Sequence, residues 1–159
     1  MSEYTDLVNK FYTAFADLDS DAMRACYHKD LVFEDPAFGE MDYENTCLMW
    51  KMLCDSQRDQ NFAISTNDLR EEGGLVKIIW EPKYKFRTGR QVHNIIYASF
   101  KFKDGLILYH RDHFNLYRWS RMALGFQGVL IGWTPFFKKG LRKQTHKMLS
   151  KYKSKHGLT

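Results

Sequence analysis

The hydrophobic positions in the first third of the chain repeat with the period of a helix. Between residues 4 and 18, apolar side chains recur at spacings of three and four and therefore share one helical face. They are Leu7, Val8, Phe11, Phe15 and Leu18. After a turn in which Ser20 is a candidate N-cap, residues 22–27 predict a short second helix. Residues 42–55 predict a third.

The pattern then changes to the period of a strand. Leu31, Phe33 and Asp35 share one face of a short strand that Pro36 ends. Four longer runs, separated by turns that contain glycine, predict an antiparallel meander. These runs are residues 62–71, 75–86, 91–102 and 106–116. The order α-α-β-α-β-β-β-β predicts an α+β fold in which helices cover one face of an antiparallel sheet.

The end of the chain has a different character. We expect a domain over residues 1–116 and a basic C-terminal helical extension over residues 117–159. Within the extension, residues 117–124 predict a short helix, and an apolar stretch punctuated by glycine follows it. Thr134-Pro135 then supplies an N-cap and a first-turn proline for a helix that runs to about Tyr152.

The charge of +5 comes from the extension alone. Residues 1–116 carry 14 Lys and Arg against 19 Asp and Glu, whereas residues 117–159 carry 10 Lys and Arg and no acid. A basic tail of this kind is only weak evidence for binding to nucleic acid. We therefore do not expect a nucleic-acid partner. Two other interpretations stay open: the apolar stretch folds back on the domain or its dimer partner, or the tail makes a weak contact with an anionic membrane.

Composition narrows the class of protein. The three cysteines form no CxxC pair, and no phosphate-binding glycine loop, nucleophile elbow or HExxH occurs, so we expect no metal and no cofactor. The N-terminus lacks a signal-peptide pattern and no apolar run is long enough to span a membrane, so we expect a soluble cytoplasmic protein. Aromatic residues make up 16% of the chain, which suggests a core or cavity walled by rings.

Three ionisable residues are candidates for chemistry. In the last strand, His110 and Asp112 share a face with Leu108 and Phe114, which points them toward the core. Asp35 can point into the same space. A carboxylate in an apolar pocket becomes a better base near neutral pH, so the three can form an acid/base set. The alternative is that Asp35 caps its turn and Asp112 forms a structural buried pair.

Aromatic residues on the inward faces are candidates for a ligand-binding wall, although such residues are also ordinary core. The candidates are Tyr12, Phe15, Phe33, Trp50, Trp80, Tyr84, Phe100 and Phe114. On the opposite face of the sheet, the alternation exposes His93, Tyr97 and Ser99. An aromatic, mildly polar sheet face is typical of a dimer surface, so we expect a homodimer through it.

Two segments carry a resemblance to a known family. Residues 8–39, VNKFYTAFADLDSDAMRACYHKDLVFEDPAFG, and residues 105–116, GLILYHRDHFNL, resemble the nuclear transport factor 2-like superfamily and its SnoaL-like and ketosteroid-isomerase-like members. Residues 130–136, LIGWTPF, resemble a bacterial SnoaL-like subgroup. The resemblance implies a cone in which a curved sheet wraps around the N-terminal helices, a conical apolar pocket, and dimerisation through the outer face of the sheet.

The resemblance also implies roles for particular residues. Asp35 in FEDP matches the isomerase general base, but Phe11 stands where the isomerase has an oxyanion-hole tyrosine, with Tyr12 on another helix face. Ala98 stands where the isomerase has a protonated aspartate. Asp112 matches an acid/base aspartate of the SnoaL-type polyketide cyclases. Epoxide hydrolases of the superfamily use an Asp-Arg-Asp set, which we rank third.

The sequence therefore favours a protein with a pocket for a small apolar molecule. One hypothesis is cofactor-free acid/base catalysis, like that of an isomerase or a cyclase, on a hydrophobic carbonyl compound. The other is a non-catalytic domain that binds an apolar ligand or serves a structural role. An enzyme needs both carboxylates on one cavity that solvent can reach, whereas a structural domain can fill that space with Trp80, Phe86 and Phe100.

Overall fold

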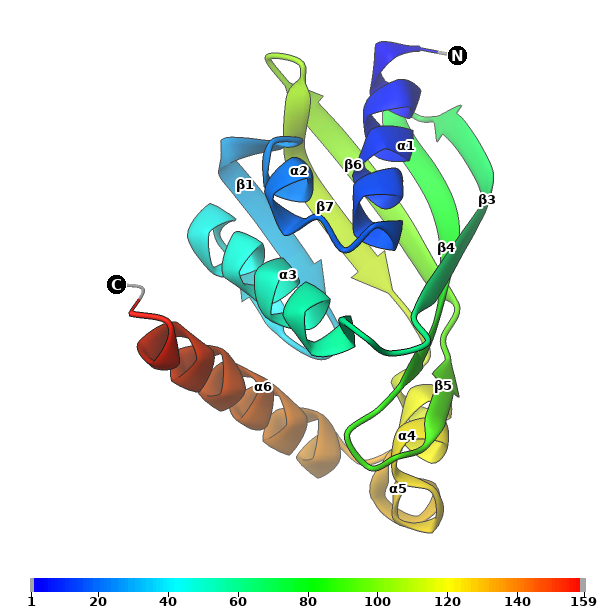
Figure 1. Ribbon diagram of the computed structural model, residues 1–159. Helices are drawn as coiled ribbons and strands as arrows, with labels where there is room; N and C mark the ends of the chain where they lie inside the picture. Colours follow the sequence, from blue (N-terminus) through cyan, green and yellow to red (C-terminus); the bar gives the residue numbers. More distant parts are fainter. Residues whose placement is uncertain (1, 158–159) are drawn as a thin grey trace.

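The computed structural model describes residues 2–157 and contains helices on one side of a curved, open sheet (Figure 1). The helices are α1 (Glu3–Ala16), α2 (Ser20–Arg24), α3 (Tyr43–Gln57), α4 (Leu116–Leu124), α5 (Phe126–Ile131) and α6 (Pro135–Lys155). The strands are β1 (Tyr27–Asp35), β2 (Gly39–Met41), β3 (Ala63–Glu72), β4 (Leu75–Lys85), β5 (Gln91–His93), β6 (Ile96–Lys103) and β7 (Leu106–His113). This is the expected α+β arrangement, with α1 and α3 wrapped by the sheet.

The sheet is mixed rather than wholly antiparallel. Its order is β2-β1-β7-β6-β4-β3, with β5 paired to β4, and β1 runs parallel to β7. The expected meander predicts pairing only between strands that follow one another in the sequence. Because the pairing of β1 with β7 joins the two ends of the domain, no local turn sets its direction. This pairing brings Phe33 beside His110, so the two candidate catalytic strands are adjacent.

Several element boundaries differ from the expected ones. Tyr27 begins β1 instead of ending the second helix, and β2 pairs back on β1 through Gly39, whose φ is +76°. The expected third long strand is broken after β5, where Asn94 bonds to the Pro82 carbonyl. The pairing of β6 with β7 shifts register near Phe102, so Ile107 is buried where Leu108 was expected. His110, Asp112 and Phe114 keep the predicted inward direction.

The core between the sheet and the helices is built largely from rings. Phe11 lies against Tyr27, Trp50 and His110, at centroid distances of 5.2, 5.9 and 5.5 Å. Phe15 lies against Trp50 and also against Trp80 of β4. Ring pairs at these separations add to the stabilisation from apolar burial alone. The aromatic pattern of the sequence is therefore mostly core.

The C-terminal extension forms three helices instead of the expected two. Residues 126–131 are helical, as α5, where only a glycine-punctuated stretch was expected. Helix α6 then runs back across the end of the domain below α3 (Figure 1). Its buried Leu149 packs into the core, and the Tyr152 hydroxyl bonds to Asp55 of α3.

Candidate functional site

Asp112 is the centre of a buried polar cluster. It lies on β7 with 4% of its surface exposed. Its Oδ1 atom is 3.0 Å from Nε2 of His110 and accepts a hydrogen bond of 3.2 Å from the Trp80 indole N–H. Within residues 2–157, its second oxygen makes no hydrogen bond, so the carboxylate retains acceptor capacity.

Two further residues extend this cluster and fix its direction. The Trp50 indole donates to the Tyr27 hydroxyl over 2.9 Å, and this hydroxyl is 2.7 Å from Nδ1 of His110. Since an indole can only donate, Tyr27 donates to Nδ1, and a neutral His110 carries its proton on Nε2 toward Asp112. Every N–H and O–H group in this series of hydrogen bonds, from Trp50 to Asp112, then has an acceptor. His110 is completely buried and is held on both sides.

Tyr12 brings a hydroxyl group without a partner to the same region. Its side chain is 4% exposed and lies 5.6 Å from Trp80 and 6.3 Å from Phe100, measured between ring centroids. The hydroxyl has no hydrogen-bond partner among the described residues. Burial raises the pKa of Tyr12 well above its usual value, and the charge of Asp112 raises it further. The tyrosine is therefore a proton donor and not a phenolate.

Tyr12 was expected on another helix face than Phe11, and the structure shows that both faces are buried. Phe11 and Tyr12 are both buried, because α1 lies on the sheet with α3 beside it (Figure 1). Phe11 faces His110, whereas Tyr12 faces the other side of the same interior, toward Trp80. Tyr12, the residue after Phe11, thus brings a hydroxyl group into the interior, where the resemblance implied that no such donor was available.

Asp35 lies at the end of β1, partly buried, in a tight turn. Its Oδ1 atom accepts a hydrogen bond of 2.6 Å from the Phe38 N–H, as the capping alternative predicted. Burial raises the pKa of Asp35 to about 7, and the nearby Asp112 contributes to the rise. The Phe38 and Ala37 N–H groups and the charge of Arg142 oppose this increase. Near neutral pH, both protonation states of Asp35 are therefore populated.

Helix α6 covers the turn that follows Asp35. Arg142 donates to the Pro36 carbonyl over 3.4 Å, Thr145 donates to the Ala37 carbonyl over 3.0 Å, and His146 Nε2 lies 2.6 Å from the Phe38 carbonyl. The return of the basic tail to this end of the cone was not predicted. Its only signal in the sequence is the apolar stripe of α6, which requires a surface to cover.

Most of the candidate ligand-binding residues meet around this cluster. Tyr12, Phe15, Phe33, Trp50, Trp80 and Phe100 form the buried wall near His110 and Asp112. Phe114 is buried directly after β7. Tyr84 instead accepts a hydrogen bond from Trp119 of α4, 2.9 Å away. Two hollows on the described part of the chain lie elsewhere, and Trp80 and Phe100 occupy the interior.

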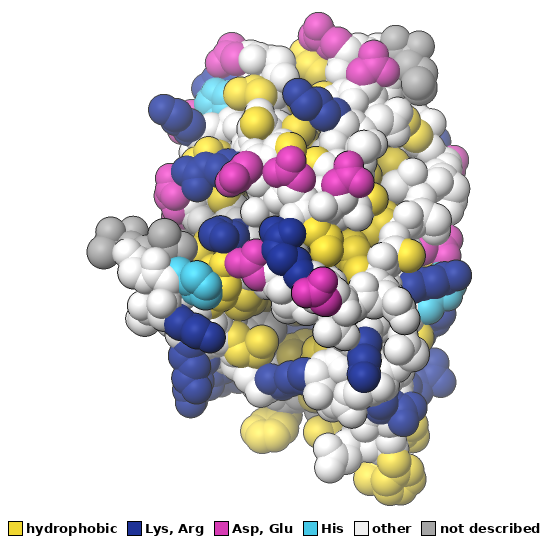
Figure 2. Space-filling model, in the orientation of Figure 1, with side chains coloured by type: hydrophobic (Ala, Val, Ile, Leu, Met, Phe, Trp, Pro, Cys, Tyr) yellow, Lys and Arg dark blue, Asp and Glu magenta, His cyan; other side chains and the backbone are white. Residues whose placement is uncertain are grey.

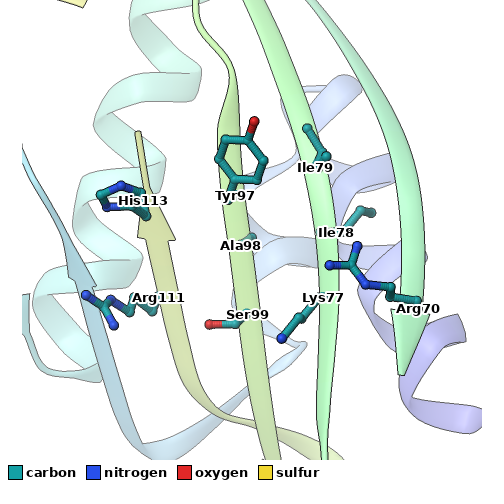
Figure 3. Close-up of a pocket in the computed structure, with 9 residues that line it drawn as sticks. All are labelled: Arg70, Lys77, Ile78, Ile79, Tyr97, Ala98, Ser99, Arg111 and His113. Carbon is teal, nitrogen blue, oxygen red and sulfur yellow. The ribbon is translucent and has the colours of Figure 1, made fainter. Parts of the chain in front are cut away.

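One of these hollows is on the outer face of the sheet (Figure 3). It has a volume of about 390 Å³, and Tyr97, which is 55% exposed, stands at its centre. Arg111 lies on this face, 2.8 Å from Glu34, so its guanidinium is separated from Asp112 by the sheet. The Asp-Arg-Asp arrangement of the epoxide hydrolases therefore does not form with Arg111.

Comparison with known proteins gives the family. The model of the SnoaL-like domain matches residues 8–110. The chain belongs to the SnoaL-like domain family. The match ends at His110, and α4, α5 and α6 lie after it.

Solved structures share the fold of this SnoaL-like domain. An epoxide hydrolase of M. tuberculosis, described as LEH-like, is similar with a TM-score of 0.64 and 22% identity, covering 80% of this chain and 92% of that chain. A putative polyketide cyclase from Xanthomonas campestris pv. campestris has a TM-score of 0.61 and 20% identity, covering 76% and 96%. A putative isomerase from Bacillus subtilis has a TM-score of 0.63 and 15% identity, covering 79% and 96%. No curated protein matches the chain.

Other groups in the SnoaL-like chain have ordinary structural roles. Cys26, Cys47 and Cys54 are buried free thiols, and burial raises the pKa of Cys47 and Cys54 to about 11. Among residues 2–157, no three His, Cys, Asp or Glu residues are grouped as metal ligands would be. None of the helices described is both long and apolar enough to cross a membrane.

Proposed function

We propose that this SnoaL-like protein is a cofactor-free acid/base enzyme that acts on a small apolar carbonyl compound. The observation that carries the proposal is the directed hydrogen-bond chain that ends on Asp112, beside the unpartnered hydroxyl of Tyr12. A buried polar group without a partner costs free energy, and its retention is consistent with a ligand that supplies the partner.

The roles follow from the hydrogen bonds. Asp112, held by the His110 and Trp80 N–H groups, is placed to accept a proton from the carbon next to a carbonyl. Tyr12 can donate to the carbonyl oxygen as negative charge develops on it. Asp35, with a pKa of about 7, returns a proton to the enolate, and exchange with solvent then removes the proton from Asp112 and restores that of Asp35. The assignment reverses the isomerase-like expectation that Asp35 is the base.

Proton exchange tests this proposal without knowledge of the natural substrate. We expect the protein to accelerate the exchange of α-hydrogens of 2-tetralone, an apolar ketone, for deuterium in D2O, followed by NMR. Asp112→Asn removes the base while its amide oxygen can still accept from His110 and Trp80. We expect this variant to lose roughly 100-fold or more of the acceleration.

Glu34→Gln is the matched control. It also removes a carboxylate, but the one on β1 that lies on the outer face of the sheet beside Arg111. It should exchange at the wild-type rate. Equal losses in the two variants, or a wild-type rate no faster than that of buffer, would contradict the assignment of Asp112 as the base.

A non-catalytic domain is the second candidate function. The observation that favours it is the filled interior, in which Tyr12, Trp80 and Phe100 pack together. The enzyme proposal therefore requires these rings to move when a substrate enters. On this alternative the folded protein leaves the 2-tetralone exchange at the uncatalysed rate. The polar cluster around Asp112 then serves only to fix the packing of the core.

The proposal includes a homodimer through the outer face of the sheet. Tyr97, which is 55% exposed, lines the hollow shown in Figure 3. Val32 of β1 is also exposed, at 38%. Covering them would remove apolar surface from water. We expect a dimer at micromolar concentration in sedimentation equilibrium, and a monomer for Tyr97→Asp, which places a charge at the centre of the contact. Phe126→Ser, an exposed aromatic residue on α5, is the control and should leave the dimer intact.

A further inference from the structure

The largest exposed hydrophobic residues of the described chain gather at one end of the molecule. Helix α5, the turn after it and the beginning of α6 carry six of them, here called the apolar tip. They are Phe126, Val129, Leu130, Ile131, Trp133 and Phe136. Phe136 is 83% exposed, Phe126 75% and Trp133 68%. In Figure 2, hydrophobic side chains project from the bottom of the molecule, where Figure 1 places α5 and the start of α6.

This exposure is built into the fold. Two glycines on the inner side of α5 allow it to lie directly against α4: a side chain at Gly128 would overlap the Ser120 carbonyl, and one at Gly132 would overlap the Ser120 hydroxyl. Gly125 starts α5 with φ +64° and ψ −130°, a conformation that favours glycine. With its small residues turned inward, α5 directs its large apolar residues outward. The segment therefore does not fold back on its own domain, which was one of the two partners expected for it.

The surroundings of the apolar tip are basic. Residues 117–159 contain 10 Lys and Arg and no acidic residue. Within residues 2–157, none of these basic groups forms an ion pair with a carboxylate. On the face drawn in Figure 2, the lower third shows Lys and Arg beside the hydrophobic side chains, and the acidic groups lie above.

We propose that the apolar tip inserts into the interfacial region of an anionic lipid membrane. Apolar residues that include tryptophan, next to unpaired basic groups, match the layers of such a membrane, since the rings enter the headgroup boundary and the cations remain among the phosphates. None of the described helices is suited to cross the bilayer, so the contact is interfacial. A second copy of the chain would suit this surface less well, because it would bring two strongly basic ends together.

Trp133 provides a specific readout. The other three tryptophans, Trp50, Trp80 and Trp119, are buried, so the exposed Trp133 should dominate any spectral change on binding. With phosphatidylcholine vesicles that contain phosphatidylserine, we expect the protein to float with the lipid at low salt and its emission to shift to shorter wavelength. Brominated lipids should quench that emission. With pure phosphatidylcholine, and at high salt, binding should weaken.

Two pairs of substitutions separate the apolar and the electrostatic contributions. Phe126→Ser with Phe136→Ser should weaken binding on the order of tenfold, through loss of buried apolar area. Lys138→Gln with Lys139→Gln should weaken it about fivefold for each charge, and only for anionic vesicles. Lys10→Gln with Lys29→Gln, which removes two exposed cations from α1 and β1, is the matched control and should bind nearly as the wild type does.

Three results would overturn the proposal. One is a protein that stays unbound with anionic vesicles at low salt. A second is binding that is unaffected by the double phenylalanine variant and is matched by heparin or duplex DNA, which would indicate a general polyanion contact. The third is a monomer-dimer equilibrium in the absence of lipid that the double phenylalanine variant abolishes, because the tip would then be covered by a second copy.

Discussion

Replacing Asp112 by alanine is expected to lower the free energy of unfolding by about 3 to 5 kcal/mol, because it breaks a buried, hydrogen-bonded pair. The carboxylate accepts from the Trp80 indole and faces Nε2 of His110, which is completely buried. Without it, both N–H groups lose their acceptor in the interior, and each such loss costs about 1 to 3 kcal/mol. Urea denaturation, followed by tryptophan fluorescence, measures the change.

Asp112→Asn is the matched comparison. Its amide oxygen can accept the same two hydrogen bonds, so we expect a loss below about 1.5 kcal/mol, within the net value of one ordinary hydrogen bond. Alanine and asparagine variants of equal stability would show that the hydrogen bonds to Asp112 contribute little. A stable asparagine variant that has also lost the exchange activity would separate the chemical role of Asp112 from its structural role.

The stability of the protein is expected to fall as the pH rises from about 4 to about 7, through Asp35. An aspartate has an ordinary pKa of 3.8, whereas the pKa of Asp35 in the folded protein is about 7. Over this interval, the unfolded chain has released a proton that the folded protein retains, so raising the pH favours unfolding, and the effect levels off above pH 7. At about 1.4 kcal/mol per pKa unit, the full effect reaches at most about 4 kcal/mol.

Asp35→Asn should remove this dependence, because the amide stays neutral and its oxygen can still accept from the Phe38 N–H. We expect the variant to be more stable than the wild type at pH 8 and nearly equal to it at pH 4, in melts monitored by circular dichroism. Glu34→Gln, on the outer face, is the control. If Asp35→Asn destabilises the protein at pH 8, the carboxylate is held ionised by its turn and by Arg142.

The part of the site that local periodicity encodes could be predicted from the sequence. A strand with one buried face must alternate, so the pattern around His110 and Asp112 directs both inward, as the structure shows. Leu108 was wrongly placed on that face because a register shift near Phe102 precedes it, and bulges leave little trace in an apolar pattern. The N-terminal helix followed from its apolar stripe in the same way.

The rest of the site depends on contacts between distant residues. Tyr27 was assigned to a helix, yet it begins β1 and links Trp50 to His110. Its signal was present, since Tyr27 continues the two-residue spacing of Leu31, Phe33 and Asp35. Tyr12 was expected on another face of its helix, but a helix buried on two sides brings both faces into the interior.

The sequence by itself determined the α+β class, the family, the inward direction of His110 and Asp112, and the charge of the C-terminal extension, since each follows from local spacing or composition. The tertiary structure decided the parallel pairing of β1 with β7, the position of α6 over the turn after Asp35, and the outward direction of the apolar tip. These depend on which surfaces meet. A one-dimensional pattern shows that an apolar face needs a partner, but only the folded chain shows which faces have found one.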